Sequence, residues 1–155
     1  MQTRSESTSI LVVEDDAILG QVLARVLTRD GQIALHVPSA SAALQFVSKQ
    51  WRRLVLLEAG LRDGTAFSLA GAIREVCAWI PIVLLTAYRL QRSALPSWLD
   101  HQVTKSTDLR DLRRTIETAL VAGQASGLST THNPFEPAFQ KNSTRPREAA
   151  MAANR

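Results

Sequence analysis

The sequence predicts an α/β fold in which helices cover both faces of a parallel sheet. Two observations support this prediction. Short apolar runs, typical of buried strands, alternate along the chain with longer stretches whose apolar residues recur at helical spacing. Nearly every short run also ends in a polar or charged residue, as expected where parallel strands end at one edge of a sheet. Strands that alternate with helices are joined by right-handed crossovers, which favours a doubly wound sheet.

Length and composition indicate one globular domain. The chain has 155 residues, of which 45% are hydrophobic and 21% are charged. It has neither a long apolar run nor a signal-peptide core, so no membrane association is expected. A single cysteine, Cys77, suits the reducing cytoplasm, which is the predicted location. The net charge of +4 is spread thinly, so no direct nucleic-acid binding is expected.

The first half of the chain contains three predicted strands and two helices. The strands are residues 9–13, 33–37 and 53–58. Asp15 or Asp16 is expected to cap the first helix, which ends at Gly31. Its apolar stripe is Ile18, Leu19, Val22, Leu23, Val26 and Leu27. A second helix is expected from Ser39 to about Gln50.

The second half adds two strands and further helices. Thr65 is expected to cap a helix whose inner side carries Phe67, Ala70, Ile73 and Cys77. The remaining strands are residues 80–85 and 102–104. Between them, Pro96 interrupts the apolar pattern of 88–100, so a short or irregular helix is expected there. Ser106 is expected to cap the last helix, whose apolar stripe is Leu109, Leu112, Ile116 and Leu120.

Five strands and five helices in about 120 residues match the size of a flavodoxin-like fold, with strand order 2-1-3-4-5. The domain is predicted to cover residues 9–123, after a flexible N-terminus at 1–8. Residues 124–155 are rich in Gly, Ser, Thr, Asn and Pro and lack periodicity. They are predicted to form a disordered C-terminal tail or a linker.

Chemically useful side chains follow four of the predicted strands: Glu14 and Asp15, Glu58, Thr86, and Lys105. In the order 2-1-3-4-5 the first and third strands flank the switch point, so three carboxylates are expected in one crevice. Carboxylates so close to one another must be offset by a cation or by a raised pKa. Oxygen ligands of this kind suit Mg²⁺. Lys105 adds a positive charge for an anion, and the Thr86 hydroxyl can donate to one.

In these motifs the sequence resembles the receiver domains of bacterial two-component response regulators. The matching segments are 10–16, 54–64, 84–87 and 103–105, which occur in the family's order. The resemblance implies that Glu14 and Asp15 are the acidic metal-binding pair and that Glu58 takes the place of the phosphoacceptor aspartate. It also implies that Thr86 is the switch hydroxyl and Lys105 the phosphate-contacting lysine. The implied function is phosphorelay signal transduction, with Mg²⁺ held by Glu14, Asp15 and Glu58.

Several residues depart from the family's pattern. Glutamate is one methylene longer than the usual aspartate, so the Glu58 carboxylate is displaced by about 1.5 Å. Impaired phosphorylation and weak Mg²⁺ binding are therefore expected. The negative charge of Glu58 is expected to replace or imitate that of the phosphorylated aspartate. Arg62 and Ser106 stand where prolines are usual, and Gln102 stands where an aromatic residue is usual. The sequence leaves open whether Glu58 is natural, engineered as a mimic, or a structural substitution. Asp63 is a minor alternative phosphoacceptor.

The resemblance also implies the partners. A sensor histidine kinase or another signalling protein is expected to bind the face formed by the fourth helix, fifth strand and fifth helix, which could also form a homodimer. Five arginines make this face basic: Arg89, Arg92, Arg110, Arg113 and Arg114. The predicted protein is therefore a signalling module and not an enzyme. Two alternatives stay open: a Mg²⁺-dependent phosphotransferase or phosphatase of similar fold, and a receiver fragment of a DNA-binding regulator.

Overall fold

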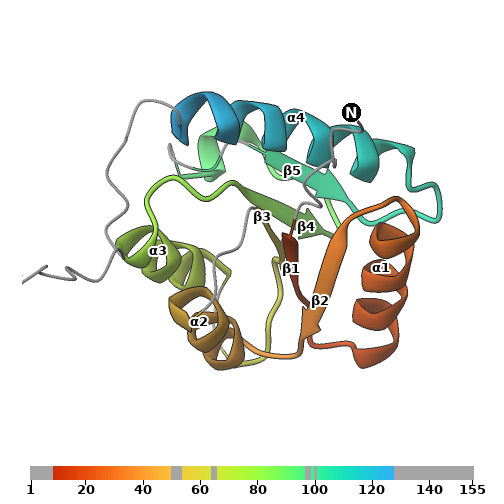
Figure 1. Cartoon of the computed structure of the whole chain (residues 1–155), viewed down its shortest axis with the longest axis horizontal. Helices are drawn as coiled ribbons and strands as arrows, with labels where there is room; N and C mark the ends of the chain where they lie inside the picture. Colours follow the sequence, from red (N-terminus) through yellow and green to blue (C-terminus); the bar gives the residue numbers. More distant parts are fainter. Residues whose placement is uncertain (1–8, 50–53, 64–65, 97–98, 100, 128–155) are drawn as a thin grey trace, which may run out of the picture.

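The structure is a computed structural model that describes residues 9–49, 54–63, 66–96, 99 and 101–127. Five parallel strands form one sheet in the order β2-β1-β3-β4-β5, which confirms the predicted order (Figure 1). The strands are β1 (Ser9–Val13), β2 (Ile33–Val37), β3 (Leu54–Glu58), β4 (Ile82–Thr86) and β5 (His101–Thr104). Every residue of β3 and β4 is buried, as expected for strands covered on both faces.

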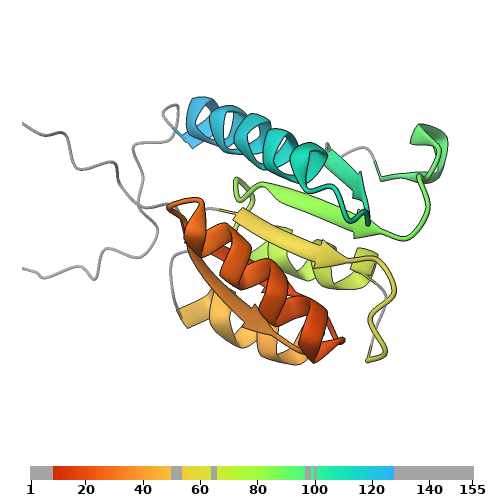
Figure 2. The same ribbon diagram turned by 90° about the vertical axis from the view of Figure 1, so that its right-hand side faces the viewer.

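Two layers of helices cover the sheet (Figures 1 and 2). One face is covered by α1 (Ala17–Arg29) and α4 (Arg110–Gly127), and the other by α2 (Ala40–Lys49) and α3 (Ala66–Val76). Strand residues alternate between the two cores because successive side chains point to opposite faces. In β1, for example, Ile10 and Val12 pack with α1 and α4, whereas Leu11 and Val13 belong to the other core.

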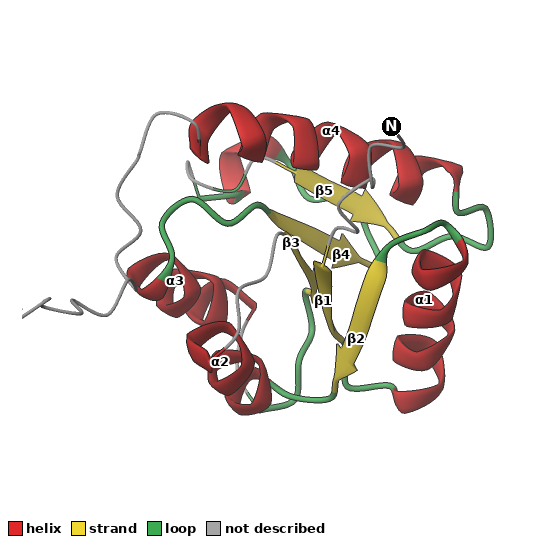
Figure 3. Cartoon of the chain, viewed as in Figure 1, coloured by secondary structure: helices red, strands yellow, loops and turns green. Residues whose placement is uncertain are grey.

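The helices agree with the prediction of four regular helices and one short or irregular one. The described residues contain four α-helices and one 3₁₀ turn, η1 (Arg92–Ala94), in the connection between β4 and β5 (Figure 3). This connection therefore carries the short element that its apolar pattern and Pro96 predicted. The other helices match the predicted ones, although α4 starts at Arg110 and runs to Gly127, beyond the expected domain end at 123.

Some apolar side chains face outward, against expectation. In α1 the buried side is formed by Gly20, Leu23 and Leu27, and Ile18 is 78% exposed. Val22 is also exposed, because both residues lie on the opposite side of a helix with 3.6 residues per turn. Phe67 is likewise exposed at the start of α3, where the inward positions are Ala66, Leu69, Ala70 and Ile73.

The helix caps differ in part from those predicted. Asp16 caps α1, since its Oδ1 accepts hydrogen bonds from the backbone N–H groups of Ile18 and Leu19 at 2.9 and 3.0 Å. Ser106 does not cap α4. Its hydroxyl accepts from the N–H of Asp108, and Asp108 in turn accepts from the first helical N–H, because the chain makes one more turn before the helix starts.

Several predictions lie outside the described residues. These are the flexible N-terminus at 1–8, the cap at Thr65 and the tail from 128 onward. Among the described helices, none is long and apolar enough to cross a membrane.

Candidate functional site

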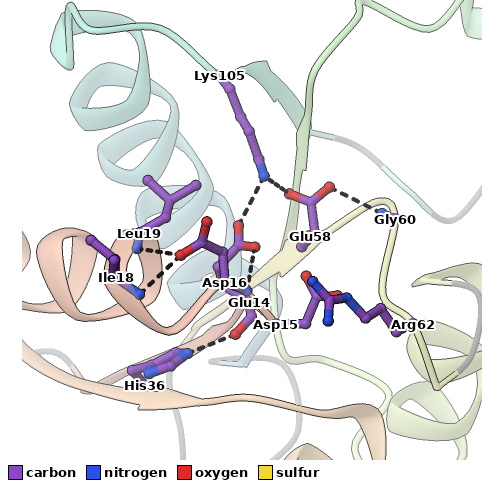
Figure 4. Close-up of polar contacts among 10 residues, drawn as sticks. All are labelled: Glu14, Asp15, Asp16, Ile18, Leu19, His36, Glu58, Gly60, Arg62 and Lys105. Carbon is purple, nitrogen blue, oxygen red and sulfur yellow. Dashed lines mark hydrogen bonds and ion pairs between the residues drawn. The ribbon is translucent and has the colours of Figure 1, made fainter.

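The carboxyl edge of the sheet brings together two buried carboxylates and one lysine (Figure 4). Glu14 directly follows β1 and is 1% exposed, and Glu58 is the last residue of β3 and is 8% exposed. Lys105 follows β5, and its backbone N–H donates to the carbonyl of Thr86 on β4. Because strands β1 and β3 are neighbours and β5 lies two strands further along, one long side chain reaches both carboxylates.

Lys105 bridges the two glutamates. Its Nζ lies 3.0 Å from Oε2 of Glu14 and 2.5 Å from Oε2 of Glu58. Burial alone would lower the pKa of Lys105, but hydrogen bonds to Glu58 and Glu14 outweigh it and raise this pKa above its ordinary value. The pKa of Glu14 is raised by burial, which the hydrogen bond from Lys105 offsets only in part.

Backbone amides hold the other oxygen of each carboxylate. Oε1 of Glu14 accepts from the N–H of Asp16 at 3.1 Å, and Oε1 of Glu58 accepts from the N–H of Gly60 at 3.0 Å. Each carboxylate therefore has one oxygen on the backbone and one on the Lys105 ammonium. Both are held in place by groups from different elements.

Asp15 is oriented away from this pair. Its Oδ2 lies 3.1 Å from Nε of Arg62, which stands where the resemblance expects a proline. Two of the three predicted carboxylates therefore converge on Lys105, and the third pairs with a separate cation. Carboxylate oxygens are suitable ligands for Mg²⁺, but among the described residues no three side chains are grouped as a metal site. Two cationic side chains of the chain itself, Lys105 and Arg62, lie beside the three carboxylates.

Asp63, the minor alternative phosphoacceptor, lies elsewhere. Both of its carboxylate oxygens accept from the backbone N–H of Ala40 at 3.1 Å, at the start of α2. This contact joins the loop after β3 to the next layer of helices and satisfies an N–H that the helix itself leaves unpaired.

The predicted switch residues bind the connection between β4 and β5. The Thr86 hydroxyl, which is buried, donates to the carbonyl of Tyr88. The side-chain amide of Gln102 forms two hydrogen bonds with Leu90: Oε1 accepts from its N–H at 3.0 Å, and Nε2 donates to its carbonyl at 2.7 Å. Both polar groups of Gln102 are thus paired with the backbone of one residue.

One supporting contact was missed in the sequence. Nε2 of His36, on β2, donates to the backbone carbonyl of Glu14 at 2.7 Å. The imidazole fits against Gly20 of α1, where an added Cβ would lie 2.2 Å from Nε2. An isolated glycine inside a helical pattern can mark such a close approach, so Gly20 was the available signal.

These features are those of a known family, and the match extends along the chain. Residues 10–117 match the model of the response regulator receiver domain. The chain belongs to this family. It is 30% identical over 122 residues to an uncharacterized 14.6 kDa protein of Leptolyngbya boryana, covering 76% of this chain and 92% of that protein. It is also 30% identical to the transcriptional regulatory protein RprY of Bacteroides fragilis, covering 74% of this chain but only 50% of RprY.

Solved receiver domains have the same architecture. The response regulator TrrA of Thermotoga maritima, solved in complex with Mg²⁺-BeF, is 29% identical with a TM-score of 0.67, over 72% of this chain and 98% of TrrA. A CheY-like receiver domain from Methanospirillum hungatei is 20% identical with a TM-score of 0.72, over 79% of this chain and all of its own length, which shows the common fold. The protein is therefore a receiver domain of two-component signalling, as its motifs predicted.

Proposed function

We propose that this receiver carries a fixed negative charge, that of Glu58, at the position where its relatives would be phosphorylated. The contact that supports this proposal is the 2.5 Å ion pair between Glu58 Oε2 and Lys105 Nζ. The resemblance makes Lys105 the lysine that contacts the phosphoryl group. In this chain its ammonium already has a carboxylate partner without any modification. The charge of Glu58 takes the place of one that a kinase and a phosphatase would add and remove.

Weak Mg²⁺ binding follows from the same arrangement. Glu14, Asp15 and Glu58 would hold the ion, and a bound Mg²⁺ would neutralise negative charge around an incoming anion. To bind there, the ion must compete with the ammonium of Lys105 for both glutamates and with Arg62 for Asp15. Two cations close together repel each other strongly at low dielectric. Binding therefore requires the lysine side chain to move.

The protein acts by binding a partner rather than by turning over a substrate. The proposed surface is the face formed by η1, β5 and α4, which corresponds to the expected face of the fourth helix, fifth strand and fifth helix. A solved complex of TrrA with the histidine kinase ThkA, at 29% identity and a TM-score of 0.67 to this chain, supports a kinase as one such partner. A second copy of this chain is the other proposed occupant of the face.

Two of the five arginines on the expected basic surface have acidic partners within the chain. Arg110 forms an ion pair with Asp108, and Arg113 forms one with Asp30 at the end of α1. Among the described residues, no ion pair engages Arg89, Arg92 or Arg114. Two of these three arginines, Arg89 and Arg92, belong to the β4–β5 connection.

Treatment with a small phosphodonor tests the proposal. Incubation with acetyl phosphate and Mg²⁺ should leave the mass of the chain unchanged, because the carboxylate is displaced and paired with Lys105. Glu58→Asp should shorten the side chain, restore the family's nucleophile and allow labelling. Glu58→Gln serves as the control that can neither pair as an anion nor be labelled. A phosphoryl adduct on the unaltered chain would overturn the proposal.

A further inference from the structure

A hollow of about 470 Å³ opens beside β5, between the β4–β5 connection and α4. The connection contributes Arg89, Leu90, Arg92 and Leu95 to its lining, and β5 contributes His101 and Gln102. The only helical element described in that connection is the 3₁₀ turn η1. This short turn is the kind of element expected from the apolar pattern and Pro96.

The hollow is formed by the fold itself. The side-chain amide of Gln102 holds the backbone of Leu90 through two hydrogen bonds. Its Oε1 accepts from the N–H of Leu90 at 3.0 Å, and its Nε2 donates to the carbonyl of Leu90 at 2.7 Å. Arg92 is fixed as well, since its Nη1 donates to the carbonyl of Leu99, a residue that is 1% exposed. A site whose walls are already ordered loses less conformational freedom when a ligand binds.

The lining combines positive charge with apolar surface. Two arginines face the hollow and no acidic residue lines it among the described residues. One guanidinium nitrogen of Arg92 is engaged, which leaves further N–H donors of its planar group, and Arg89 is exposed. An arginine fork matches a carboxylate with two parallel hydrogen bonds. Leu90 and Leu95 are partly buried and provide the apolar part of the surface.

We propose that this hollow binds an extended acidic segment of a protein partner, in which a carboxylate side chain stands next to an apolar one. The carboxylate would pair with Arg89 and Arg92, and the apolar side chain would pack on Leu90 and Leu95. This inference rests on the proposed function, because it specifies the chemistry of the partner that binds the face of η1, β5 and α4. A nucleic acid fits less well. Its phosphates would have to contact the three arginines of α4, and two of these are paired with Asp108 and Asp30.

The experiment uses the full chain labelled with ¹⁵N and a short synthetic peptide of alternating glutamate and leucine. The expected result is saturable binding that shifts the amide signals of Leu90, Gln91 and Gln102 and weakens as salt is added. A matched peptide with lysine in place of glutamate should not bind. Failure of the glutamate peptide to bind at millimolar concentration overturns the proposal. So does equal binding of a single-stranded oligonucleotide of the same charge at the same amides.

Two arginine variants separate a site from general attraction. Arg89→Glu should weaken peptide binding by about tenfold or more, because it reverses a charge inside the hollow. Arg25→Glu makes the same charge change on the exposed side of α1 and should alter affinity by less than about twofold. Equal effects of the two variants would overturn the site. Neither variant alters the Glu58 site, so the two proposals are tested separately. Labelling of the unaltered chain by acetyl phosphate would refute the proposed function, whereas peptide binding tests the hollow.

Discussion

Lys105 and Glu58 form an ion pair of 2.5 Å across two strands of the sheet, at a place where the Glu58 side chain is only 10% exposed. Glu14 shares the same ammonium at 3.0 Å and is even more deeply buried. A buried charge is costly when its partner is removed, because the group left behind has neither water nor a counter-ion. Lys105 is therefore the residue on which both glutamates depend.

Lys105→Met should lower the free energy of unfolding by about 2 kcal/mol. Removing one member of a buried ion pair is strongly destabilising, and the partial exposure of Lys105 reduces the effect here. Urea unfolding followed by circular dichroism measures the change. Arg25→Met, on the exposed surface of α1, is the control and should change stability by less than about 0.5 kcal/mol. Equal stability of Lys105→Met and the unaltered chain would show that the pair contributes nothing.

The pH dependence of stability is a second measurement on the same variant. The pKa of Lys105 is raised in the folded state above its ordinary value of 10.5. Its contribution to stability is therefore fully present below that value and is lost as the pH rises through the higher folded value. The stability difference between the unaltered chain and Lys105→Met should shrink in this alkaline range. A difference that stays constant there would contradict the raised pKa.

Much of this site was predictable because the chain places its chemistry at strand ends. Each inner strand is an uninterrupted apolar run, so its end and the polar residue after it are visible in the sequence. With the order 2-1-3-4-5, residues after β1, β3 and β5 must meet at one edge. The convergence of Glu14, Glu58 and Lys105 follows from that topology.

The missed features depend on individual side-chain directions. Asp15 is adjacent to Glu14 in sequence, yet it pairs with Arg62 because neighbouring residues in the loop after β1 point to different sides. The two hydrogen bonds of Gln102 to Leu90 join residues 12 positions apart, and the path of the chain between them has no periodic pattern. Apolar spacing indicates which residues are buried, but not how an irregular connection folds back.

Magnesium binding should improve when the competing ammonium is removed. The unaltered chain is expected to bind Mg²⁺ weakly, since Lys105 already occupies both glutamates. Lys105→Met should bind the ion at least about tenfold more tightly, which corresponds to roughly 1.4 kcal/mol. Isothermal titration calorimetry measures both affinities. Sub-micromolar binding by the unaltered chain, or no gain in Lys105→Met, would contradict competition between the two cations.

Gly20 and His36 should show strong coupling in a double-mutant cycle. An alanine at Gly20 would place its Cβ 2.2 Å from the imidazole, so His36 would have to leave the carbonyl of Glu14. Gly20→Ala alone should therefore destabilise the protein. With His36→Ala already present, the same change should stabilise it by up to about 1 kcal/mol, because alanine favours a helix more than glycine does. Additive effects in urea unfolding would refute the close packing of the two residues.

Gln102→Leu should release the backbone of Leu90. The leucine keeps the size of the side chain but provides neither partner, so the two Leu90 hydrogen bonds are lost. Hydrogen exchange of the Leu90 amide should become faster by about tenfold or more, and stability should fall by about 1–2 kcal/mol. Gln21→Leu, on the exposed side of α1, is the matched control. Unchanged exchange at Leu90 would show that Gln102 does not hold the connection.

The same clamp leads to a prediction about the switch. In receiver domains that respond to phosphorylation, the strand-four hydroxyl and a strand-five aromatic change position together. Here the Thr86 hydroxyl is bound to Tyr88, and Gln102 holds Leu90 through both of its polar groups.

A ligand shifts a population only by its difference in affinity for the two states, and Glu58 already provides a charge that no phosphatase removes. Beryllofluoride with Mg²⁺ should therefore change the affinity for a partner, or for a second copy of the chain, by less than about tenfold, or 1.4 kcal/mol of coupling. The paired variant Glu58→Asp with Gln102→Tyr should recover a larger response. A change beyond tenfold in the unaltered chain, measured by analytical ultracentrifugation or by titration with the partner, would show a working switch.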